Sequence, residues 1–303
     1  MAVRTPLVEC PRERVGERAF FKAENLQPIG AFKIRGAYNK IASLPEADRR
    51  RGVITYSSGN HAQAVAYAAR AFATKAVIVM PSNAPPIKQQ ATVALGAEIV
   101  LVGPASAERQ AKAEELAAQH GYAMVPPYDD PSIVAGQGTC GLEIVEDLPE
   151  VELVLAPISG GGLLSGIATA VKLSKPNVRV VGVEPELAGD AQESFRSGSV
   201  VEWPAEKTSR TIADGLRTQS VGAIPFEHIR CYVDDIITVT EDEIREAMRR
   251  IALHARLVAE PSGAVSFAGF LFHRDKLPRS DCTVAVISGG NVDPVLMARV
   301  ITS

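Results

Sequence analysis

The chain has 303 residues, of which 46% are hydrophobic and 22% charged, and its 32 basic and 35 acidic residues leave a net charge of −3. Such a chain can bury a large core in one or two globular domains. The balanced charge, without a basic stripe, makes nucleic acid and membrane surfaces poor candidate partners. The four cysteines are scattered with no Cys-x-x-Cys pair, so neither a zinc site nor a disulfide framework is predicted. No apolar run suits a signal peptide or a membrane span, so we expect a soluble cytoplasmic protein.

Short β-rich runs alternate with helical patterns along most of the chain. In chain order we expect a strand at 19–23, a helix at 32–43, a strand at 52–56, a helix at 61–72, a strand at 75–80, a helix at 85–95, a strand at 97–102, helices at 106–119 and 131–148, a strand at 152–158, a helix at 163–173, and strands at 178–183 and 282–287. Residues 186–217 are irregular and are expected to loop over the surface. Thr240-Glu241-Asp242-Glu243 predicts a capping box at the start of another helix. The alternation indicates an α/β fold, with a parallel sheet covered by helices on both faces.

The first candidate site is the segment around Lys33. Pro28 and Gly30 set a bend before Phe32, and Lys33 then opens the predicted helix. An ammonium group between Phe32 and Ile34, in a mostly apolar neighbourhood, loses its proton more easily than a solvated one, and it then serves as an amine nucleophile and base. Taken alone, a single lysine is more often a solvated surface group.

The second candidate is the run Ser159-Gly160-Gly161-Gly162, between a buried strand and a helix. Consecutive glycines let the backbone approach an anion closely, and the free N–H groups of the helix start favour a phosphate. The alternative is a tight strand-to-helix turn. A dinucleotide fingerprint would need Gly-x-Gly-x-x-Gly, whereas Gly166 stands four residues after Gly162. Glu184 does lie at about the distance of a ribose-binding acid, so a nicotinamide-dependent dehydrogenase remains a remote alternative.

Two further polar turns follow predicted strands. Ser57-Ser58-Gly59-Asn60-His61 offers hydroxyls, an amide and exposed N–H groups that suit a carboxylate or a polar ring substituent, with a simple helix cap as the alternative. Ser288-Gly289-Gly290-Asn291 places a small hydroxyl at the C-terminal end of the last strand, the edge where ligands of open α/β sheets bind. His61 has no acidic companion at triad-like positions and no His-Glu-x-x-His occurs, so serine hydrolases and metalloproteases are excluded.

Taken in chain order (the Lys33 segment, 57–61, 159–162 and 288–291), these four motifs resemble the fold-type II pyridoxal-phosphate enzymes, and within them the serine/threonine dehydratases (threonine ammonia-lyases) and the serine racemases. The resemblance runs from about Thr5 to Asp293 and includes the segments 135–139 and 212–215. It implies a tryptophan synthase β-like fold of two open, twisted α/β domains. Residues 1–51 and 130–303 would form the large domain and residues 52–129 the small one, with the cofactor in the cleft between them. It also implies a homodimer.

The resemblance further implies roles for individual residues. Lys33 would bind the cofactor aldehyde covalently, and Asn60 would hydrogen-bond the ring hydroxyl. Contacts to the cofactor are implied for Phe32 and Gly215 on the two ring faces, for Ser288 at the pyridine nitrogen, and for Ser159, Gly160, Gly161, Gly162 and Leu163 at the phosphate. The substrate carboxylate would be bound by Ser57, Ser58, Gly59, Asn60 and His61. A divalent cation, Mg²⁺ or Ca²⁺, would be held by Glu184, the Ala188 carbonyl and Asp190, although isolated acids are usually surface charges.

The expected reaction is elimination of the β-hydroxyl of L-threonine or L-serine, giving 2-oxobutyrate or pyruvate plus ammonia. Lys33 would remove the Cα proton, and Ser288, which cannot hold the ring nitrogen protonated, would favour prompt elimination. The alternatives are a serine racemase, with Ser58 as the second acid/base, and a 3-hydroxyaspartate dehydratase. A catalytically silent binding protein would be expected to have lost Lys33 or Asn60. Because the chain ends soon after Asp293, a regulatory domain that senses isoleucine is not expected.

Overall fold

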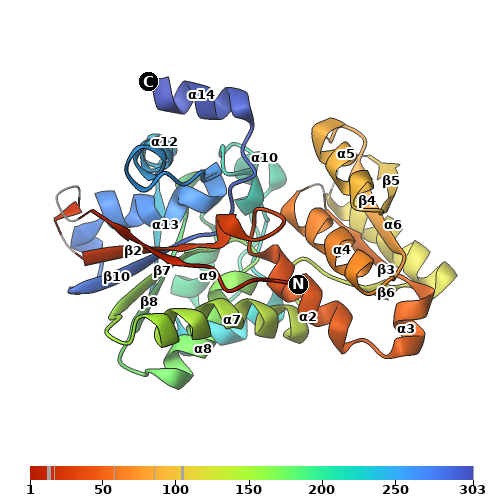
Figure 1. The fold of residues 1–303 in the computed structure, drawn as a ribbon, viewed down its shortest axis with the longest axis horizontal. Helices are drawn as coiled ribbons and strands as arrows, with labels where there is room; N and C mark the ends of the chain where they lie inside the picture. The colour runs from red at the N-terminus through yellow and green to blue at the C-terminus, as the bar shows by residue number, and fades with distance from the viewer. Residues whose placement is uncertain (12–14, 17, 58, 85, 104–105, 303) are drawn as a thin grey trace.

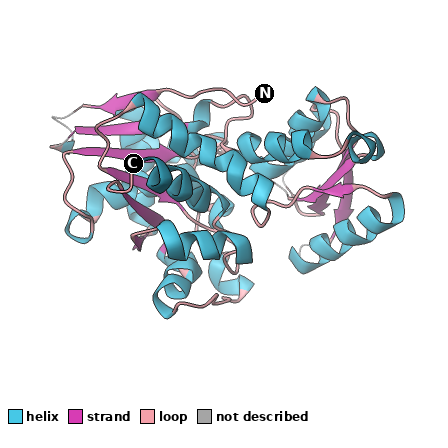
Figure 2. Ribbon diagram, turned by 90° about the horizontal axis from the view of Figure 1, so that it is seen from below, coloured by secondary structure: helices cyan, strands magenta, loops and turns pink. Residues whose placement is uncertain are grey.

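The structure, a computed structural model, describes the whole chain except residues 12–14, 17, 58, 85, 104–105 and 303. It contains two sheets, which lie apart in the left and right parts of the molecule (Figures 1 and 2). The larger sheet has, in spatial order, the strands β1 (Leu7–Cys10), β2 (Arg18–Ala23), β10 (Cys282–Ile287), β7 (Leu153–Pro157), β8 (Arg179–Pro185) and β9 (Asp235–Val239). The smaller sheet has β5 (Glu98–Val102), β4 (Ala76–Pro81), β3 (Val53–Tyr56) and β6 (Ala123–Met124).

The smaller sheet is parallel throughout, whereas the larger sheet is mixed. Its outer strand β1 pairs antiparallel with β2, and the remaining pairs are parallel. The expected parallel sheet is confirmed except at this edge, where β1, a strand that the sequence analysis did not predict, runs antiparallel. The reason is the short connection between β1 and β2, because a parallel pair needs a crossover of a dozen residues or more.

Helices cover both faces of the sheets and connect them. They are α2 (Lys33–Ser43), α3 (Glu46–Arg51), α4 (Asn60–Ala71), α5 (Pro86–Ala94), α6 (Ser106–His120), α7 (Pro131–Asp147), α8 (Gly162–Ser174), α9 (Asp190–Ser197), α10 (Ala205–Thr208), α11 (Ala223–Tyr232), α12 (Glu241–Arg250), α13 (Pro261–Phe272) and α14 (Pro294–Thr302). Shorter turns are η1 (Glu24–Leu26), η2 (Glu186–Ala188), η3 (Asp214–Leu216), the π-helical η4 (Ile251–Ala255) and η5 (Arg274–Lys276). No helix among the described residues has the length and apolar character needed to cross a bilayer.

Most predicted elements are present with boundaries within one or two residues, and the capping box of α12 is confirmed. Thr240 accepts from the Glu243 backbone N–H, and the Glu243 carboxylate accepts from that of Thr240. The expectation of a surface loop at 186–217 was wrong in part, because α9 and α10 lie there. The buried face of α9 consists of Asp190, Ala191 and Ser194, so it carries no apolar stripe for a periodicity argument to detect.

Each sheet has an apolar core on both faces. Side chains of α13 and α12 pack on one face of the larger sheet, and those of α7, α8 and α11 pack on the other. The smaller sheet is covered by α2 and α4 on one face and by α6 on the other. Coverage on both faces explains why the central strands read as continuous apolar runs without alternation. The smaller sheet lies within residues 52–129, while the division into two domains stays a prediction.

Helix α2 lies between the two halves of the molecule (Figure 1). It packs against α4, which covers the smaller sheet, and against α7, which covers the larger one. Its first residue is Lys33. The chain therefore places this lysine where the two halves meet.

Candidate active site

The turn that carries Lys33 is tied to the C-terminal end of β10. Ala31 forms an isolated β-bridge with Gly289, and the Phe32 N–H donates to the Ser288 carbonyl at 3.0 Å. These contacts bring two predicted site segments together, although they are more than 250 residues apart in the sequence.

The Lys33 side chain is partly buried and is bound by a backbone carbonyl. Its Nζ donates to the carbonyl of Pro127 at 2.7 Å and lies 5.2 Å from the centre of the Phe32 ring. Among the described residues, no carboxylate lies within 4.0 Å of this nitrogen, as an ion pair would require. Burial lowers the pKa of Lys33 to about 8. At pH 7 roughly a tenth of the amine is therefore uncharged, far more than for an ordinary lysine, and able to act as a nucleophile or base.

The glycine loop lies beside the Lys33 amine, because Tyr128 packs on it and directly follows Pro127. A Cβ atom on Gly160 would lie 2.4 Å from the Tyr128 ring, and one on Gly162 would lie 3.0 Å from the Tyr128 Cβ. Gly161 has φ +89°, a left-handed conformation that favours glycine. Helix α8 begins at Gly162, so the first N–H groups of this helix, including that of Leu163, have no partner within the helix.

The segment 218–222 closes the other side of this loop. The hydroxyls of Ser159 and Thr218 lie 2.6 Å apart, and the Gly222 N–H donates to the Gly160 carbonyl at 3.1 Å. The loop thus presents backbone donors, a hydroxyl pair and a helix start in one place. This combination suits a phosphate group.

Ser288 and Gly215 meet at the first turn of α13. The buried Ser288 hydroxyl lies 3.4 Å from the carbonyl of Ser262, whose own hydroxyl accepts from the Gly215 N–H at 2.9 Å. The structure thus groups two of the predicted contacts to the cofactor ring around one residue of α13.

The turn before α4 is only partly described, because the predicted catalytic residue Ser58 lies outside the described residues. The Ser57 hydroxyl accepts from the Gly59 N–H at 3.3 Å, and Asn60 is the first residue of α4. The buried His61 places its Nε2 2.9 Å from the Val125 carbonyl. Burial, together with the charge of Lys33, lowers the pKa of His61 to about 3. His61 is therefore neutral at physiological pH and brings no positive charge to a substrate carboxylate.

The predicted metal residues lie together at the end of β8. Glu184 and Asp190 are both buried, and each has one carboxylate oxygen without a hydrogen-bond partner, while Ala188 lies between them in η2. Burial, with repulsion from Asp190, raises the pKa of Glu184, and burial raises that of Asp190 to about 7. Among the described residues, no group of three or more His, Cys, Asp or Glu side chains is arranged to hold a metal ion.

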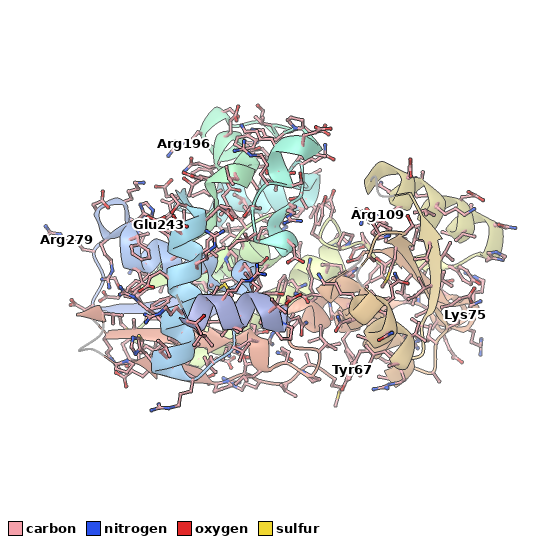
Figure 3. All side chains as sticks on the ribbon, turned by 90° about the horizontal axis from the view of Figure 1, so that it is seen from above. Tyr67, Lys75, Arg109, Arg196, Glu243 and Arg279 are labelled. Carbon is pink, nitrogen blue, oxygen red and sulfur yellow. The ribbon has the colours of Figure 1, made fainter. Side chains whose placement is uncertain are left out.

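Three residues near these segments carry no recognisable sequence motif. Tyr128 covers the glycine loop, and Glu260 accepts a hydrogen bond from Asn60. Arg109 of α6 has a buried Nε without a hydrogen-bond partner, and no ion pair of its guanidinium occurs in the described part of the chain. The charge of Arg109 interacts with Tyr56, which directly precedes Ser57. Burial lowers the pKa of Arg109. Arg109 lies in the half built on the smaller sheet, near the side that faces the half built on the larger sheet (Figure 3).

The site thus combines a lysine of lowered pKa with a glycine loop that suits a phosphate, and an enzyme with an amine-bound phosphate cofactor needs both kinds of group. The chain belongs to the pyridoxal-phosphate-dependent enzyme family, whose model matches residues 2–289. Its fold is that of the fold-type II members.

The curated relatives are ammonia-lyases and racemases. The chain is 43% identical over 290 residues to the L-threo-3-hydroxyaspartate ammonia-lyase of Saccharomyces cerevisiae, covering 96% of this chain and 88% of that one. It is 43% identical over 282 residues to the catabolic L-threonine dehydratase TdcB of Escherichia coli, covering 93% and 85%. The structure of maize serine racemase matches with a TM-score of 0.94 and 36% identity, covering 99% of this chain and 92% of that one. The protein is thus a pyridoxal-phosphate-dependent enzyme of the group that contains these lyases.

Proposed function

We propose that the enzyme eliminates the β-hydroxyl of L-threonine and L-serine, releasing 2-oxobutyrate or pyruvate together with ammonia. The observation that carries this proposal is the Lys33 amine, which lies at the meeting point of the two halves, has no acidic partner among the described residues, and has a pKa lowered to about 8. An amine of this kind can both bind a cofactor aldehyde and move a proton. The sequence identity to a threonine lyase and a hydroxyaspartate lyase supports the same reaction.

The residues present fit pyridoxal phosphate. Lys33 would bind its aldehyde, and the glycines at the start of α8 would hold its phosphate because their backbone allows close approach at a helix N-terminus. Asn60 would donate to the ring hydroxyl and Ser288 would face the ring nitrogen. Phe32 and Gly215 would lie against the two faces of the ring.

The reaction then depends on where this chain holds and moves protons. When bound, pyridoxal phosphate withdraws electrons from the substrate Cα and makes its proton acidic. Once the substrate amine has replaced it on the cofactor aldehyde, the freed Lys33 amine, partly uncharged near neutral pH, would remove that proton. The Ser288 hydroxyl cannot form an ion pair with a protonated ring nitrogen, which favours prompt departure of the β-hydroxyl over reprotonation at Cα. The N–H groups at the start of α4, with Ser57 and Ser58, orient the substrate carboxylate, and Ser58 is the candidate acid/base on the opposite face.

Arg109 favours L-threo-3-hydroxyaspartate as a second substrate. A partly buried guanidinium without a carboxylate partner in the described chain, close to the strand end that precedes Ser57, can pair with the distal carboxylate of a dicarboxylic amino acid. L-Threonine and L-serine offer no such group. The expectation is that hydroxyaspartate is also dehydrated, and that Arg109 sets the balance between the two substrate classes.

The test is a substrate panel with the holoenzyme. L-Threonine, L-serine and L-threo-3-hydroxyaspartate are incubated separately, and the 2-oxo acid and the D-enantiomer are measured in the same samples. We expect 2-oxobutyrate and pyruvate to form faster than any D-amino acid. D-Serine appearing faster than pyruvate would make the enzyme a serine racemase, and oxaloacetate as the dominant product would make it a hydroxyaspartate dehydratase.

The variant Arg109→Leu tests the role of the guanidinium. It should lower kcat/KM for hydroxyaspartate about tenfold or more, as expected for the loss of a charge-assisted hydrogen bond, and leave kcat/KM for L-threonine nearly unchanged. Lys112→Leu, which removes a positive charge from the same helix at a residue paired with Glu115, is the matched control. An equal loss for both substrates would remove Arg109 from substrate selection.

We also propose a divalent cation at Glu184, the Ala188 carbonyl and Asp190. Two adjacent buried carboxylates, each with an unpartnered oxygen, support it, because a cation would relieve their repulsion. We also propose a homodimer and the division into the domains 1–51 with 130–303 and 52–129, both on the family resemblance. A cytoplasmic location is proposed on the scattered cysteines, which suggest no disulfide framework.

A further inference from the structure

The side-chain amide of Asn60 is held from both ends. Its Nδ2 donates to Oε1 of Glu260 at 2.7 Å, and its Oδ1 accepts from Nδ2 of Asn291 at 2.8 Å. Asn60 belongs to α4 on the smaller sheet, whereas both partners belong to the half built on the larger sheet. The amide is thus fixed by two residues of the opposite half of the molecule.

Glu260 is built into this position. It precedes Pro261 at the start of α13, and its backbone N–H donates to the Gly289 carbonyl at 3.0 Å. Its side chain is buried, with the residue 5% exposed. A Cβ atom on Gly289 would lie 2.1 Å from Glu260 Oε1, so only glycine at 289 leaves room for this carboxyl group.

Asn291 connects the same amide to the Lys33 turn. Its Nδ2 also donates to the Ile29 carbonyl at 2.8 Å. Gly30, the next residue, has φ +71°, and a Cβ atom there would lie 2.4 Å from Asn291 Oδ1. In the motif at the end of β10, Gly289 leaves room for Glu260, and Asn291 binds both Asn60 and the turn before Lys33. Only Ser288 of this motif has a proposed contact to the cofactor.

Among the described residues, these contacts leave Asn60 one unused hydrogen-bond donor. An amide NH₂ group has two hydrogens and Glu260 takes one, while Asn291 occupies the oxygen. Turning the amide by half a rotation would place its NH₂ group against the Nδ2 donor of Asn291, which the Ile29 carbonyl holds in place, and that hydrogen bond would be lost. The orientation of the remaining N–H is therefore set by the two partners.

We propose that Glu260 and Asn291 are positioning residues that fix the Asn60 amide so that its remaining N–H donates to the ring hydroxyl of the cofactor. The inference rests on the proposed function, since it needs the cofactor ring beside Asn60. It predicts that losing either partner weakens cofactor binding and changes the visible absorbance of the bound cofactor, because both depend on the hydrogen bond to the ring hydroxyl.

The protonation of Glu260 gives this arrangement a pH signature. Burial, with the nearby charge of Asp214, raises the pKa of Glu260 to about 8, against the hydrogen bond from Asn60 and the charge of Lys88. Lys88 and Asp214 form an ion pair with each other at 2.7 Å. Glu260 is accordingly neutral at pH 7, where glutamine is a close substitute for it, and it ionises above pH 8.

The experiment compares the wild-type holoenzyme with Glu260→Gln, Glu260→Leu and Asn291→Ala, using the visible spectrum and the dissociation constant for pyridoxal phosphate. At pH 7 we expect Glu260→Gln to match the wild type. Glu260→Leu and Asn291→Ala should shift the absorbance maximum and raise the dissociation constant about fivefold to tenfold, the effect of one lost hydrogen bond. The wild-type spectrum should change between pH 7 and 9, and that of Glu260→Gln should not.

Controls separate positioning from general damage. Glu246→Gln, on α12 in an ion pair with Arg250, should behave as wild type. Asn291 is exposed, so its replacement should be tolerated by the fold. If Glu260→Leu fails to fold, the spectrum and the dissociation constant of Asn291→Ala test the inference. Wild-type spectra and affinities for both Glu260→Leu and Asn291→Ala would overturn the inference, as would a loss in Glu260→Gln at pH 7 equal to that in Glu260→Leu. A wild-type protein that takes up no pyridoxal phosphate would instead overturn the proposed function.

Discussion

Replacing Arg35 by methionine should destabilise the protein severely. Arg35 lies in the first turn of α2, two residues after Lys33, and is only 4% exposed. Its guanidinium donates to both oxygens of Glu24 at 2.7 Å and to both oxygens of Glu143 at 2.6 and 2.7 Å. Lys22, which is fully buried, donates to Glu143 at 2.7 Å. The cluster joins β2, η1, α2 and α7 beneath the Lys33 turn.

The expected loss of unfolding free energy follows from the buried charge that the substitution leaves without a partner. Methionine keeps much of the side-chain volume and the helix propensity, but it leaves the buried carboxylate of Glu24 without its cation. Breaking a buried ion pair in this way costs about 3–5 kcal/mol. Arg50→Met is the matched control, because Arg50 and Glu46 are 70% and 71% exposed, and a pair so exposed contributes about 0.5 kcal/mol or less.

The assay is urea denaturation of the protein without cofactor, followed by circular dichroism, with the slope m compared between variants. A second variant, Arg35→Met with Glu24→Gln, should recover part of the loss because the orphaned charge is gone. Hydrogen bonds from Arg35 and Lys22 hold the pKa of Glu143 below its usual range although burial alone would raise it. The stability from Glu143 is therefore lost as pH falls through that pKa. A free energy of unfolding for Arg35→Met within about 1 kcal/mol of the wild type would refute this reasoning.

Three further predictions concern the site. Lys33→Ala should abolish both the visible absorbance of the bound cofactor and turnover, and substantial remaining dehydratase activity would show that another group is the base. Exhaustive chelation should lower the melting temperature, with Mg²⁺ or Ca²⁺ restoring it, and an unchanged melting point and activity would exclude the cation at Glu184 and Asp190. Glu260→Gln should raise the melting temperature more at pH 9 than at pH 5. The folded-state pKa of about 8 lies above the unfolded value, so the wild type loses stability as pH rises toward 8. An equal change in melting temperature at both pH values would contradict the raised pKa of Glu260.

Most of the secondary structure could be predicted from local patterns in the sequence. The Thr240 capping box, the glycines before α8 and the apolar runs of the central strands each depend on neighbours within a few residues, so the sequence alone could indicate them. Helix α9 was missed because its buried face is made of small and polar residues. Strand β1 was not predicted, and neither was its antiparallel pairing with β2, because pairing across a sheet is not encoded in a single strand.

The sequence pointed to candidate site residues only where several motifs occur together. Lys33 alone looks like a solvated surface group, and it was singled out because four motifs in chain order resemble one enzyme family. Glu260 and Arg109 were not found, because a single acid or base in a sequence looks like a surface charge. Their significance lies in burial and in partners that are far away, such as the 200 residues between Asn60 and Glu260. Only the folded chain brings these groups together.

The central claim is that Lys33 carries the cofactor, and reductive trapping tests it most directly. The holoenzyme is treated with borohydride, which fixes the cofactor permanently to the amine that holds it, and the digested protein is mapped by mass spectrometry. We expect one modified peptide, with the cofactor on Lys33, and no such peptide from Lys33→Ala. Modification of a different lysine in the wild type, or equal labelling of Lys33→Ala, would contradict the account.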